Sequence, residues 1–397
     1  MEHEMENSDE VISIDAIAAL AARAGITSVT MLAWRDLDDG EAGGSELHAH
    51  RIAACWAKAG LKVEMRTSMV PGQPERIWRD GYSVIRRGGR YQVFLQVMLE
   101  GIRRRWRNDE ALVEIWNGMP FFGPLWFKGP RVVVLHHVHG PMWRLALSPL
   151  LARVGETIEQ HLAPPLYRSS RVLTLSDSSK HEIVEQLHLK PANIDVIAPG
   201  IEDRFSPGGT LAAVPTVVAV GRLVPVKRID VLIEQLVATK RQVPDLVAII
   251  VGEGYLHDEL AALIARHGAA SWLTLAGHVG DAELIELYRS AWVVTSASLR
   301  EGWGMTLTEA AACGTPAVAS DIAGHRDAVV AGVSGLLTEP GPEFVAALVR
   351  VLTDSSLRAE LSRGALENAK RFRWGRTAEA AFQALAEVAE RRHRRSR

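Results

Sequence analysis

The chain has 397 residues, of which 47% are hydrophobic and 23% are Asp, Glu, Lys or Arg. This composition is ordinary for globular proteins, so it excludes a disordered or fibrous class, and the length predicts two to three domains at roughly 150 residues each. The formal net charge of −2 gives no global sign of a nucleic-acid-binding protein, and we expect no nucleic-acid partner.

The cysteines and the amino terminus bear on the cellular compartment. Cys55 and Cys313 lie far apart in alanine-rich segments, which predicts neither a disulfide framework nor a zinc motif. The acidic amino terminus lacks the basic start of a secretory signal, and no run approaches the ~18 apolar residues of a membrane span. We expect a cytoplasmic protein, either soluble or peripheral at the inner face of the membrane.

The first half of the chain predicts an α/β domain over residues 27–205, after a helical extension at 1–26. A buried strand, TSVTMLAW, starts at Thr27 and ends in a loop with two adjacent glycines. From Ala49 to Trp56 the apolar residues recur with helical spacing, and a second strand, LKVEMRT, follows. Further strands are expected at YSVIRR, ALVEIWN, RVVVLHH and RVLTLS.

The second half predicts another α/β domain, over residues 206–375. A segment rich in proline and glycine at 199–215 separates the strand-like runs DVIA and TVVAV. Strands and helices then alternate. The predicted strands are TVVAVGRL, LVAIIVGEG, WLTLAG, AWVVTSAS and PAVAS, and the helices between them are IDVLIEQLVATK and residues 257–267, 281–290 and 306–313. A helix within 376–397 is expected to pack back on the first domain. Its arginine-rich end, RRHRRSR, is interpreted as a frayed solvated tail, with a binding arm as the alternative.

This organisation predicts two Rossmann-like, doubly wound domains. Ligands of open α/β sheets bind outside the carboxyl ends of the strands. Two such sheets are therefore expected to face one interdomain cleft that holds the substrate site.

A glycine-containing loop between two predicted strands is the most informative segment. It runs from Glu301 through Gly-Trp-Gly-Met-Thr-Leu-Thr to Glu309 and opens a helix. Its small residues let backbone N–H groups approach a phosphate or a sugar, while Glu309 could accept hydrogen bonds from ribose hydroxyls. Helix amino termini favour Glu in any case, so a capping role for either acid stays open at this point.

A cationic pair follows the first strand of the second domain. Arg222 and Lys227 lie five residues apart, after Gly221 and before a helix. Arg offers a bidentate fork and Lys a mobile charge, so the pair suits a diphosphate leaving group. Gly252-Glu253-Gly254 forms another tight turn at the end of the next strand.

Taken together, these motifs resemble family 4 of the retaining glycosyltransferases, which have two facing Rossmann-like domains in the GT-B fold. The resemblance covers residues 28–385, and it rests on the double glycine, the strand ending in His, SDSSK, PGIE, GRLVPVK, VGEG and EGWGMTLTEAAACGTPAVAS. It implies hexosyl transfer from UDP- or GDP-hexose with retained configuration, without a metal or other cofactor. The donor would bind mainly to the second domain, and the acceptor would be a carbohydrate, a glycolipid or a small hydroxyl compound.

The resemblance also implies roles for individual residues. Arg222 and Lys227 match the pair that binds diphosphate, Glu301 the acid that contacts the donor sugar, and Glu309 the acid that binds ribose. The remaining substrate-binding positions are Gly43, Gly44, Gly221, Gly252, Glu253, Gly302, Trp303, Gly304, Met305 and Thr306. Trp303 stands where Phe is commoner in the family.

The strand RVVVLHH leads into three histidines, His136, His137 and His139. Adjacent strand residues point to opposite faces and no Cys or distant His pattern completes a site, so metal ligation is disfavoured. His136 best matches the family histidine that hydrogen-bonds the donor sugar, with His137 or His139 as competitors. A histidine satisfied inside the core is the alternative for whichever of them points inward.

Two polar segments are interpreted structurally. Asp36 and Asp38 form a D-x-D, which holds a metal in another glycosyltransferase architecture. The basic residues of the second domain make a metal redundant, so we predict no metal site and interpret these acids as caps. Ser176, in SDSSK, is expected to cap a helix.

A locally basic stretch spans residues 76–107, with nine arginines, Asp80 and Glu100 among Trp78, Tyr82 and Trp106. It is compatible with a surface that contacts an anionic membrane or an anionic acceptor. It is equally compatible with a solvated helix and hairpin face whose arginines pair with acids elsewhere.

Two other functions remain open on sequence grounds. One is a nucleotide-sugar epimerase or sugar phosphorylase on the same fold, and the other is a catalytically idle subunit that binds a nucleotide sugar. Intact motifs argue against the idle subunit, while the Arg222/Lys227 pair together with Glu301 and Glu309 favours transfer.

Overall fold

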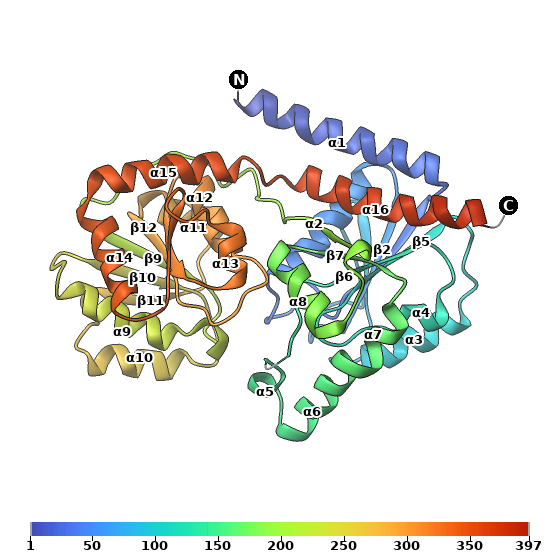
Figure 1. The fold of residues 1–397 in the computed structure, drawn as a ribbon, viewed down its shortest axis with the longest axis horizontal. Helices are drawn as coiled ribbons and strands as arrows, with labels where there is room; N and C mark the ends of the chain where they lie inside the picture. The colour runs from blue at the N-terminus through green and yellow to red at the C-terminus, as the bar shows by residue number, and fades with distance from the viewer. Residues whose placement is uncertain (1, 141, 396–397) are drawn as a thin grey trace. The chain divides into compact units, whose positions relative to one another are not determined.

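A computed structural model describes residues 2–140 and 142–395, which divide into two compact units (Figure 1). Unit 1 contains the chain up to Gly200 and the chain from Arg373 onwards, and unit 2 contains Ile201–Phe372. Each unit is built on one mainly parallel sheet with covering helices. The predicted α/β class with two Rossmann-like domains is confirmed.

The sheet of unit 1 has the strand order β3-β4-β2-β1-β5-β6-β7-β8. Its strands are β1 (Ser28–Leu32), β2 (Lys62–Thr67), β3 (Arg76–Arg79), β4 (Tyr82–Arg86), β5 (Glu110–Ile115), β6 (Arg131–Val134), β7 (Arg171–Thr174) and β8 (Ile194–Val196). Successive strands lie on one side of β1 and then on the other, so the order reverses between β1 and β5.

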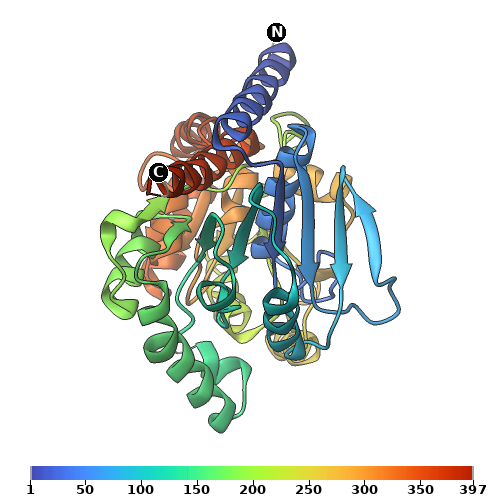
Figure 2. The ribbon, with the colours of Figure 1, turned by 90° about the vertical axis from the view of Figure 1, so that its right-hand side faces the viewer.

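The edge of this sheet carries a hairpin, as one interpretation of the basic stretch expected, although its first strand was not placed from the sequence (Figure 2). Strand β3 runs antiparallel to β4, and Asp80 and Gly81 turn the chain with φ of 45° and 85°. An Asp-Gly pair with both φ values positive is the favoured two-residue hairpin turn. The strand was missed because RIWR is short and its charged ends are typical of an edge.

The helices of unit 1 vary widely in length. They are α1 (Glu2–Ala24), α2 (Gly44–Lys58), α3 (Gln92–Arg103), α4 (Gly123–Trp126), α5 (Met142–Ala146), α6 (Pro149–Thr157), α7 (Ala163–Tyr167), α8 (Asp177–Leu187) and α16 (Trp374–Arg395), with the π-helical turn η1 (Ile158–Leu162) and the 3-10 turn η2 (Pro191–Asn193). Ser176 accepts a hydrogen bond from the Ser179 N–H at the start of α8. The predicted serine cap is confirmed.

The last helix of the chain, α16, belongs to unit 1. It packs against α1, α2, β6 and β7. The indole N–H of Trp56 donates to the Ala378 carbonyl at 2.9 Å, and the Trp56 ring meets Phe382 edge-on at 5.3 Å. The helix continues through Arg395, so the expected fraying was wrong for this stretch, whereas residues 391–394 are exposed, as expected of a solvated end. Residues 396–397 lie outside the described part.

The sheet of unit 2 is parallel throughout, with the order β11-β10-β9-β12-β13-β14. Its strands are β9 (Thr216–Val220), β10 (Val247–Val251), β11 (Leu273–Gly277), β12 (Val293–Ser296), β13 (Ala317–Ser320) and β14 (Gly335–Thr338). The order reverses between β9 and β12, which makes this the topological switch point, the place where open α/β sheets bind ligands.

Helices cover the sheet of unit 2. They are α9 (Ile229–Lys240), α10 (His257–Arg266), α11 (Asp281–Ser290), α12 (Met305–Ala312), α13 (Ala323–Ala328), α14 (Pro342–Thr353) and α15 (Ser355–Ala369), with the 3-10 turn η3 (Pro225–Lys227). The core packs strand residues such as Val217 and Ile250 against helix residues such as Leu232, Leu236 and Leu348. The predicted strand and helix segments up to PAVAS all appear here.

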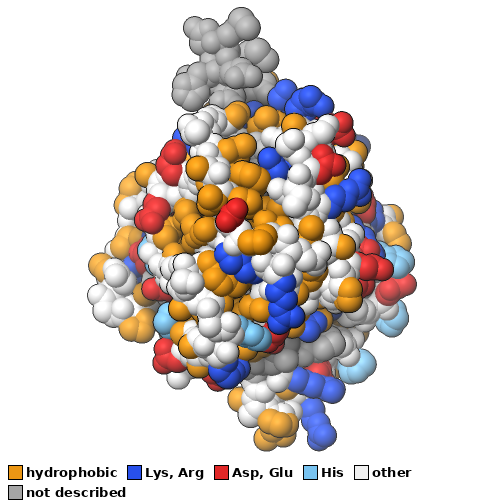
Figure 3. All heavy atoms as spheres, turned by 90° about the vertical axis from the view of Figure 1, so that its left-hand side faces the viewer, with side chains coloured by type: hydrophobic (Ala, Val, Ile, Leu, Met, Phe, Trp, Pro, Cys, Tyr) orange, Lys and Arg blue, Asp and Glu red, His pale blue; other side chains and the backbone are white. Residues whose placement is uncertain are grey.

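The surface of unit 2 carries both signs of charge. On the face drawn in Figure 3, Lys and Arg side chains are scattered among Asp and Glu side chains and hydrophobic ones. Among the described residues, no helix has both the length and the apolar character that crossing a membrane requires. Cys55 and Cys313 are buried free thiols.

Candidate functional site

Three loops meet at the carboxyl ends of β9, β10 and β12 in unit 2. Gly221 follows β9 directly, and its N–H donates to the Val251 carbonyl at the end of β10 at 2.9 Å. The Leu299 N–H, after β12, donates to the Val226 carbonyl at 2.8 Å. These backbone bonds bring the GRLVPVK segment next to the loop that carries Glu301.

Glycines allow this close approach. A Cβ on Gly252, whose φ is +137°, would lie 2.0 Å from the Gly221 carbonyl oxygen, and a Cβ on Gly254 would lie 2.3 Å from that of Leu223. Real Cβ atoms do not come so near, so only glycine fits at either position. Glu253, between them, is exposed.

Lys227 and Glu301 form an ion pair across the topological switch point. The Lys227 Nζ lies 2.5 Å from Glu301 Oε1, and the Ser298 hydroxyl donates to the same oxygen at 2.8 Å. The aliphatic stem of Lys227 lies against Gly221, with Cδ 3.6 Å from where a Cβ would be. The pair therefore fixes an ammonium group where the carboxyl ends of two neighbouring strands meet.

The electrostatics of Glu301 follow from this pairing. Burial opposes its ionisation, but the charge of Lys227, the proximity of His325 and the hydrogen bonds from Lys227 and Ser298 outweigh burial and lower the pKa of Glu301. Glu301 is thus an anion at neutral pH. Arg222, next to Gly221, is exposed and lies at the same end of β9.

Glu309 lies on α12 in a different environment. Burial raises its pKa to about 7, although the Tyr288 hydroxyl, which donates to Glu309 Oε2 at 3.2 Å, acts in the opposite direction. This carboxyl is therefore poised to change charge near neutral pH.

The start of α12 leaves backbone donors without a side-chain cap. The first residues of this helix are Met305 and Thr306. Gly304 is its N-cap residue, and no side chain forms a capping hydrogen bond there. Free N–H groups at a helix amino terminus suit an anion or a polar sugar oxygen. Trp303 is buried edge-on against Phe372 at 5.3 Å, so its ring shapes the loop from within, and Gly302 precedes it.

In unit 1, the double glycine lies at the switch point between β1 and β5. Gly43 is the N-cap of α2 and Gly44 its first residue. The Gly43 N–H donates to Glu46 Oε2 at 2.9 Å, and Glu46 Oε1 also lies 3.2 Å from the Arg35 guanidinium. In this conformation the Gly43 N–H is therefore already hydrogen-bonded to the Glu46 carboxylate.

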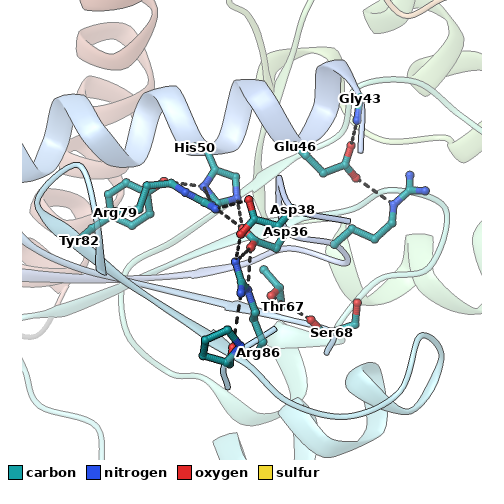
Figure 4. A network of polar contacts seen from close by, with 12 residues as sticks. Asp36, Asp38, Gly43, Glu46, His50, Thr67, Ser68, Arg79, Tyr82 and Arg86 are labelled. Atoms are coloured by element: carbon teal, nitrogen blue, oxygen red, sulfur yellow. Dashed lines mark hydrogen bonds and ion pairs between the residues drawn. The ribbon is translucent and has the colours of Figure 1, made fainter. Parts of the chain in front are cut away.

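The loop before these glycines is fixed by a buried ionic network (Figure 4). The Asp36 carboxylate accepts from Arg79 at 2.6 Å and from Arg86 at 2.7 Å, and His50 Nε2 lies 3.1 Å away. Asp38 is paired with the same two arginines. Burial would raise the pKa of Asp36, but His50 and Arg79 hold it well below its ordinary value.

This network explains the D-x-D differently from a cap. Both carboxylates are neutralised by guanidinium groups from the β3–β4 hairpin, so the prediction that the acids cap a helix was wrong. A cation at this place would have to displace two arginines. Among the residues that the structure describes, no group of three or more His, Cys, Asp or Glu side chains is arranged to hold a metal ion.

The three histidines after β6 differ in their surroundings. His136 is buried, and its Nε2 lies 3.2 Å from Nδ1 of His48 on α2. Burial lowers the pKa of His136 well below its usual value and that of His48 to about 4, so both rings are neutral at physiological pH. His137 and His139 are partly exposed and stack on each other at 4.9 Å.

The basic stretch at 76–107 is largely paired. Arg79 and Arg86 hold Asp36 and Asp38, and four more of its nine arginines form ion pairs, namely Arg87 with Glu75, Arg90 with Glu41, Arg104 with Glu64 and Glu110, and Arg107 with Asp109. Tyr82 is buried and Trp106 stacks on Trp126, while Trp78 is exposed. Most of the charge that a membrane contact would use is thus engaged within the unit.

Several residues of the site escaped the sequence analysis. Ser298 had a signal, since it lies three residues before Glu301 in the same loop. Tyr288 and His325 had none, because their proximity arises only when α11 and the six-residue helix α13 fold against the sheet. A Cβ on Gly324 would lie 2.3 Å from the Glu301 carbonyl oxygen, which shows how closely α13 approaches this loop.

Comparison with known proteins places these features in a family. The family model "Glycosyl transferases group 1" matches residues 207–368, and "Glycosyltransferase Family 4" matches residues 42–205. The chain belongs to glycosyltransferase family 4.

Curated relatives and solved structures agree with this assignment. The chain is similar to the D-inositol 3-phosphate glycosyltransferases of Kribbella flavida, 33% identical over 56% of this chain and 57% of the relative, and of Segniliparus rotundus, 25% identical over 92% and 90%. With the first of these, the match spans less than two thirds of the relative's length. Sucrose-phosphate synthase from Thermosynechococcus elongatus shares the fold, with a TM-score of 0.75 and 20% identity over 89% of this chain and 97% of that one. The fold of this family 4 member is GT-B.

Proposed function

We propose that this family 4 protein is a retaining hexosyltransferase that moves a hexose from a UDP- or GDP-hexose to an acceptor hydroxyl without a metal. The observation that carries the proposal is the Lys227–Glu301 pair at the topological switch point of unit 2, beside Gly221 and Arg222. It joins a cation for the diphosphate to an anion for the sugar at the usual ligand position of such a sheet.

The proposed step is a displacement on one face of the sugar. The bond from the anomeric carbon to the diphosphate oxygen breaks, and the acceptor oxygen bonds to that carbon on the same face. The departing diphosphate takes the proton of the acceptor hydroxyl. Arg222 and Lys227 neutralise the charge that grows on the leaving group, which is where preorganised cations lower a barrier most.

The remaining residues are assigned to binding. Glu301 would contact the hexose, Glu309 the ribose hydroxyls, and the uncapped start of α12 a sugar or phosphate oxygen. His136 is proposed to hydrogen-bond the donor sugar, with His137 and His139 as its competitors. Unit 2 would hold the donor and unit 1 the acceptor, in a cytoplasmic protein.

An assay of nucleoside diphosphate release tests the proposal. Each of UDP-glucose and GDP-mannose is incubated with and without candidate acceptors, beginning with D-inositol 3-phosphate because relatives carry that name. Release that requires an acceptor, an axial anomeric product by NMR and full activity in EDTA are expected. Conversion of the donor without an acceptor would point to an epimerase, and activity lost in EDTA but restored by manganese would overturn the metal-free step.

A further inference from the structure

Unit 1 contains a cavity at the edge of its sheet where the strands begin. The cavity has a volume of about 720 Å³. Arg131 and Arg171, the first residues of β6 and β7, line it, and so does Asn193, which precedes β8. The glycine loop and the three histidines follow the opposite ends of the strands, so this cavity lies away from the site described above.

The lining of this cavity is strongly basic. Six of its fourteen residues are Arg or Lys, against the single acid Glu387, and they are Arg131, Arg168, Arg171, Lys190, Arg391 and Arg392. The last two come from the arginine-rich end of α16, which lies beside β6 and β7 (Figure 2). Segments that are far apart in the sequence thus place like charges around one space.

Arg131 is one of the partly buried cations of this lining. Its Nη2 donates to the Ser170 hydroxyl at 3.1 Å and its Nη1 to the Phe127 carbonyl at 3.3 Å, and its charge interacts with the buried Glu114. Among the described residues, its buried Nε has no hydrogen-bond partner. Leaving a buried charged donor unsatisfied is costly. An anion in the cavity would supply the missing acceptor.

Two exposed cations of the lining lack acidic partners. Among the described residues, the side chains of Arg168 and Lys190 form no ion pair, whereas Arg171 is held by Asp195 and Arg391 lies 3.7 Å from Glu387. Clustered like charges repel one another and raise the free energy of the folded chain unless counter-ions or a ligand neutralise them.

We propose that this cavity binds a soluble anion that carries two or more phosphate groups. Guanidinium forks and an ammonium group around one concave space match phosphate oxygens, and several cations need more than one phosphate. The apolar contribution to the lining is only Ala384 and Val388, besides Gly129. A lipid surface would need larger apolar anchors here, so the chemistry favours a free polyphosphate.

Calorimetric titration of the full chain with inorganic tripolyphosphate tests this site. The double variant Arg168→Ala/Lys190→Ala removes two exposed cations and should fold normally, which its melting temperature checks. We expect it to bind at least about tenfold more weakly than the wild type, equivalent to about 1.4 kcal/mol, because it removes two of the cations that line the cavity.

Two matched variants separate the cavity from other basic surfaces. Lys62→Ala/Arg105→Ala removes two exposed cations of unit 1 outside the lining and should leave the affinity unchanged. Arg222→Ala/Lys227→Ala should also retain binding at this cavity. The comparison is repeated in this background, so neither tripolyphosphate bound at the proposed diphosphate site nor failure of the proposed transfer function affects the result. Equal affinity in the wild type and the Arg168/Lys190 variant would overturn the proposal.

A second experiment, with lipid vesicles, tests whether the phosphate groups that bind the cavity belong to a membrane lipid. Sedimentation with phosphatidylglycerol vesicles is expected to show no difference between the wild type and the Arg168/Lys190 variant. Vesicle binding that this variant loses, without binding of tripolyphosphate by the wild type, would also overturn the proposal, in favour of a membrane contact.

Discussion

Lys227 is restrained before any ligand arrives, because Glu301 holds its ammonium group and Gly221 leaves room for its stem. Such restraint means that little reorganisation is needed when charge develops on a leaving group. The side chains of Lys227 and Glu301 are only 21% and 18% exposed, respectively. Solvent therefore screens this pair less than a surface pair.

Alanine at Arg222 or Lys227 should reduce turnover by about 100-fold or more, equivalent to ~2.7 kcal/mol of lost transition-state stabilisation. The fold should survive, because neither side chain is part of the core. Steady-state kinetics with the sugar nucleotide measure the effect, and Lys370→Ala, an exposed lysine of unit 2, is the control. Near wild-type turnover in both folded variants would contradict the leaving-group role.

Glu309 gives a pH dependence. Ribose hydroxyls donate hydrogen bonds, so binding needs the ionised carboxylate, and the pKa of about 7 places only about one-tenth of it in that form at pH 6 but about nine-tenths at pH 8. Affinity for the nucleoside diphosphate should therefore rise by up to about tenfold between these values. Binding titrations of the nucleoside diphosphate to Glu309→Gln at the same pH values isolate the effect. The affinity of this variant should depend on pH only through ionisation of the phosphate. Identical profiles would remove Glu309 from the ribose site.

The histidines are distinguished by comparing two ligands. His136→Ala should lower turnover of the intact sugar nucleotide by one to two orders of magnitude while affinity for the free nucleoside diphosphate barely changes, because the hydrogen bond is assigned to the hexose. The same measurements on His137→Ala and His139→Ala serve as controls. If one of these variants instead shows the selective loss of turnover, that histidine contacts the hexose in place of His136. If all three variants only have a lower melting temperature, the histidines have a structural role.

At the level of secondary structure, the loop after β1 depends on the β3–β4 hairpin. Arg79 and Arg86 stand at the ends of β3 and β4 and hold Asp36 and Asp38, with Asp36 and Arg86 fully buried. The hairpin thereby fixes the segment that leads to Gly43 and Gly44.

Removing Asp36 tests this dependence. Asp36→Ala should lower the free energy of unfolding by about 3–5 kcal/mol, because it removes the buried partner of Arg86 and leaves only the exposed Asp38 to compensate that buried charge. Arg87→Ala is the matched control, since its pair with Glu75 is exposed and such pairs contribute only about 0–1 kcal/mol. Urea titrations compare the two. A similar small loss in both would show that the network does not hold the loop.

The sequence predicted local elements well and long-range partners poorly. Periodicity and turn residues placed helices such as Ile229–Lys240 and strands such as Val247–Val251. The pairing of Asp36 with Arg86, fifty residues away, and of His136 with His48, eighty-eight residues away, left no local pattern, because each arises when distant segments pack together. The acids were therefore interpreted as caps, although their partners lay in the basic stretch already singled out.

Across the whole molecule, the chain leaves unit 1 at Gly200 and returns to it at Arg373. Unit 1 is therefore incomplete until its last segment has been made. The contacts of α16 are those of a core element: Phe382 is fully buried against Trp56, and the Thr377 hydroxyl donates to the Ala198 carbonyl at 2.8 Å. A Cβ on Gly200 would lie 2.3 Å from the backbone N of Trp374. The segment that leaves unit 1 and the segment that returns to it are therefore closely packed.

Phe382→Ala should consequently destabilise unit 1 while unit 2 keeps its own stability. Truncating a buried phenylalanine costs about 3–5 kcal/mol, because a cavity remains where the ring packed. Hydrogen exchange resolves the two units: amides in α2 and β6 should exchange on the order of 100-fold to 1,000-fold faster, whereas those of β9 and β10 keep their rates. Arg394→Ala, exposed on the same helix, is the control and should change neither set. Equal acceleration in both units would mean that they unfold together, and that the returning helix stabilises the entire chain rather than the unit it completes.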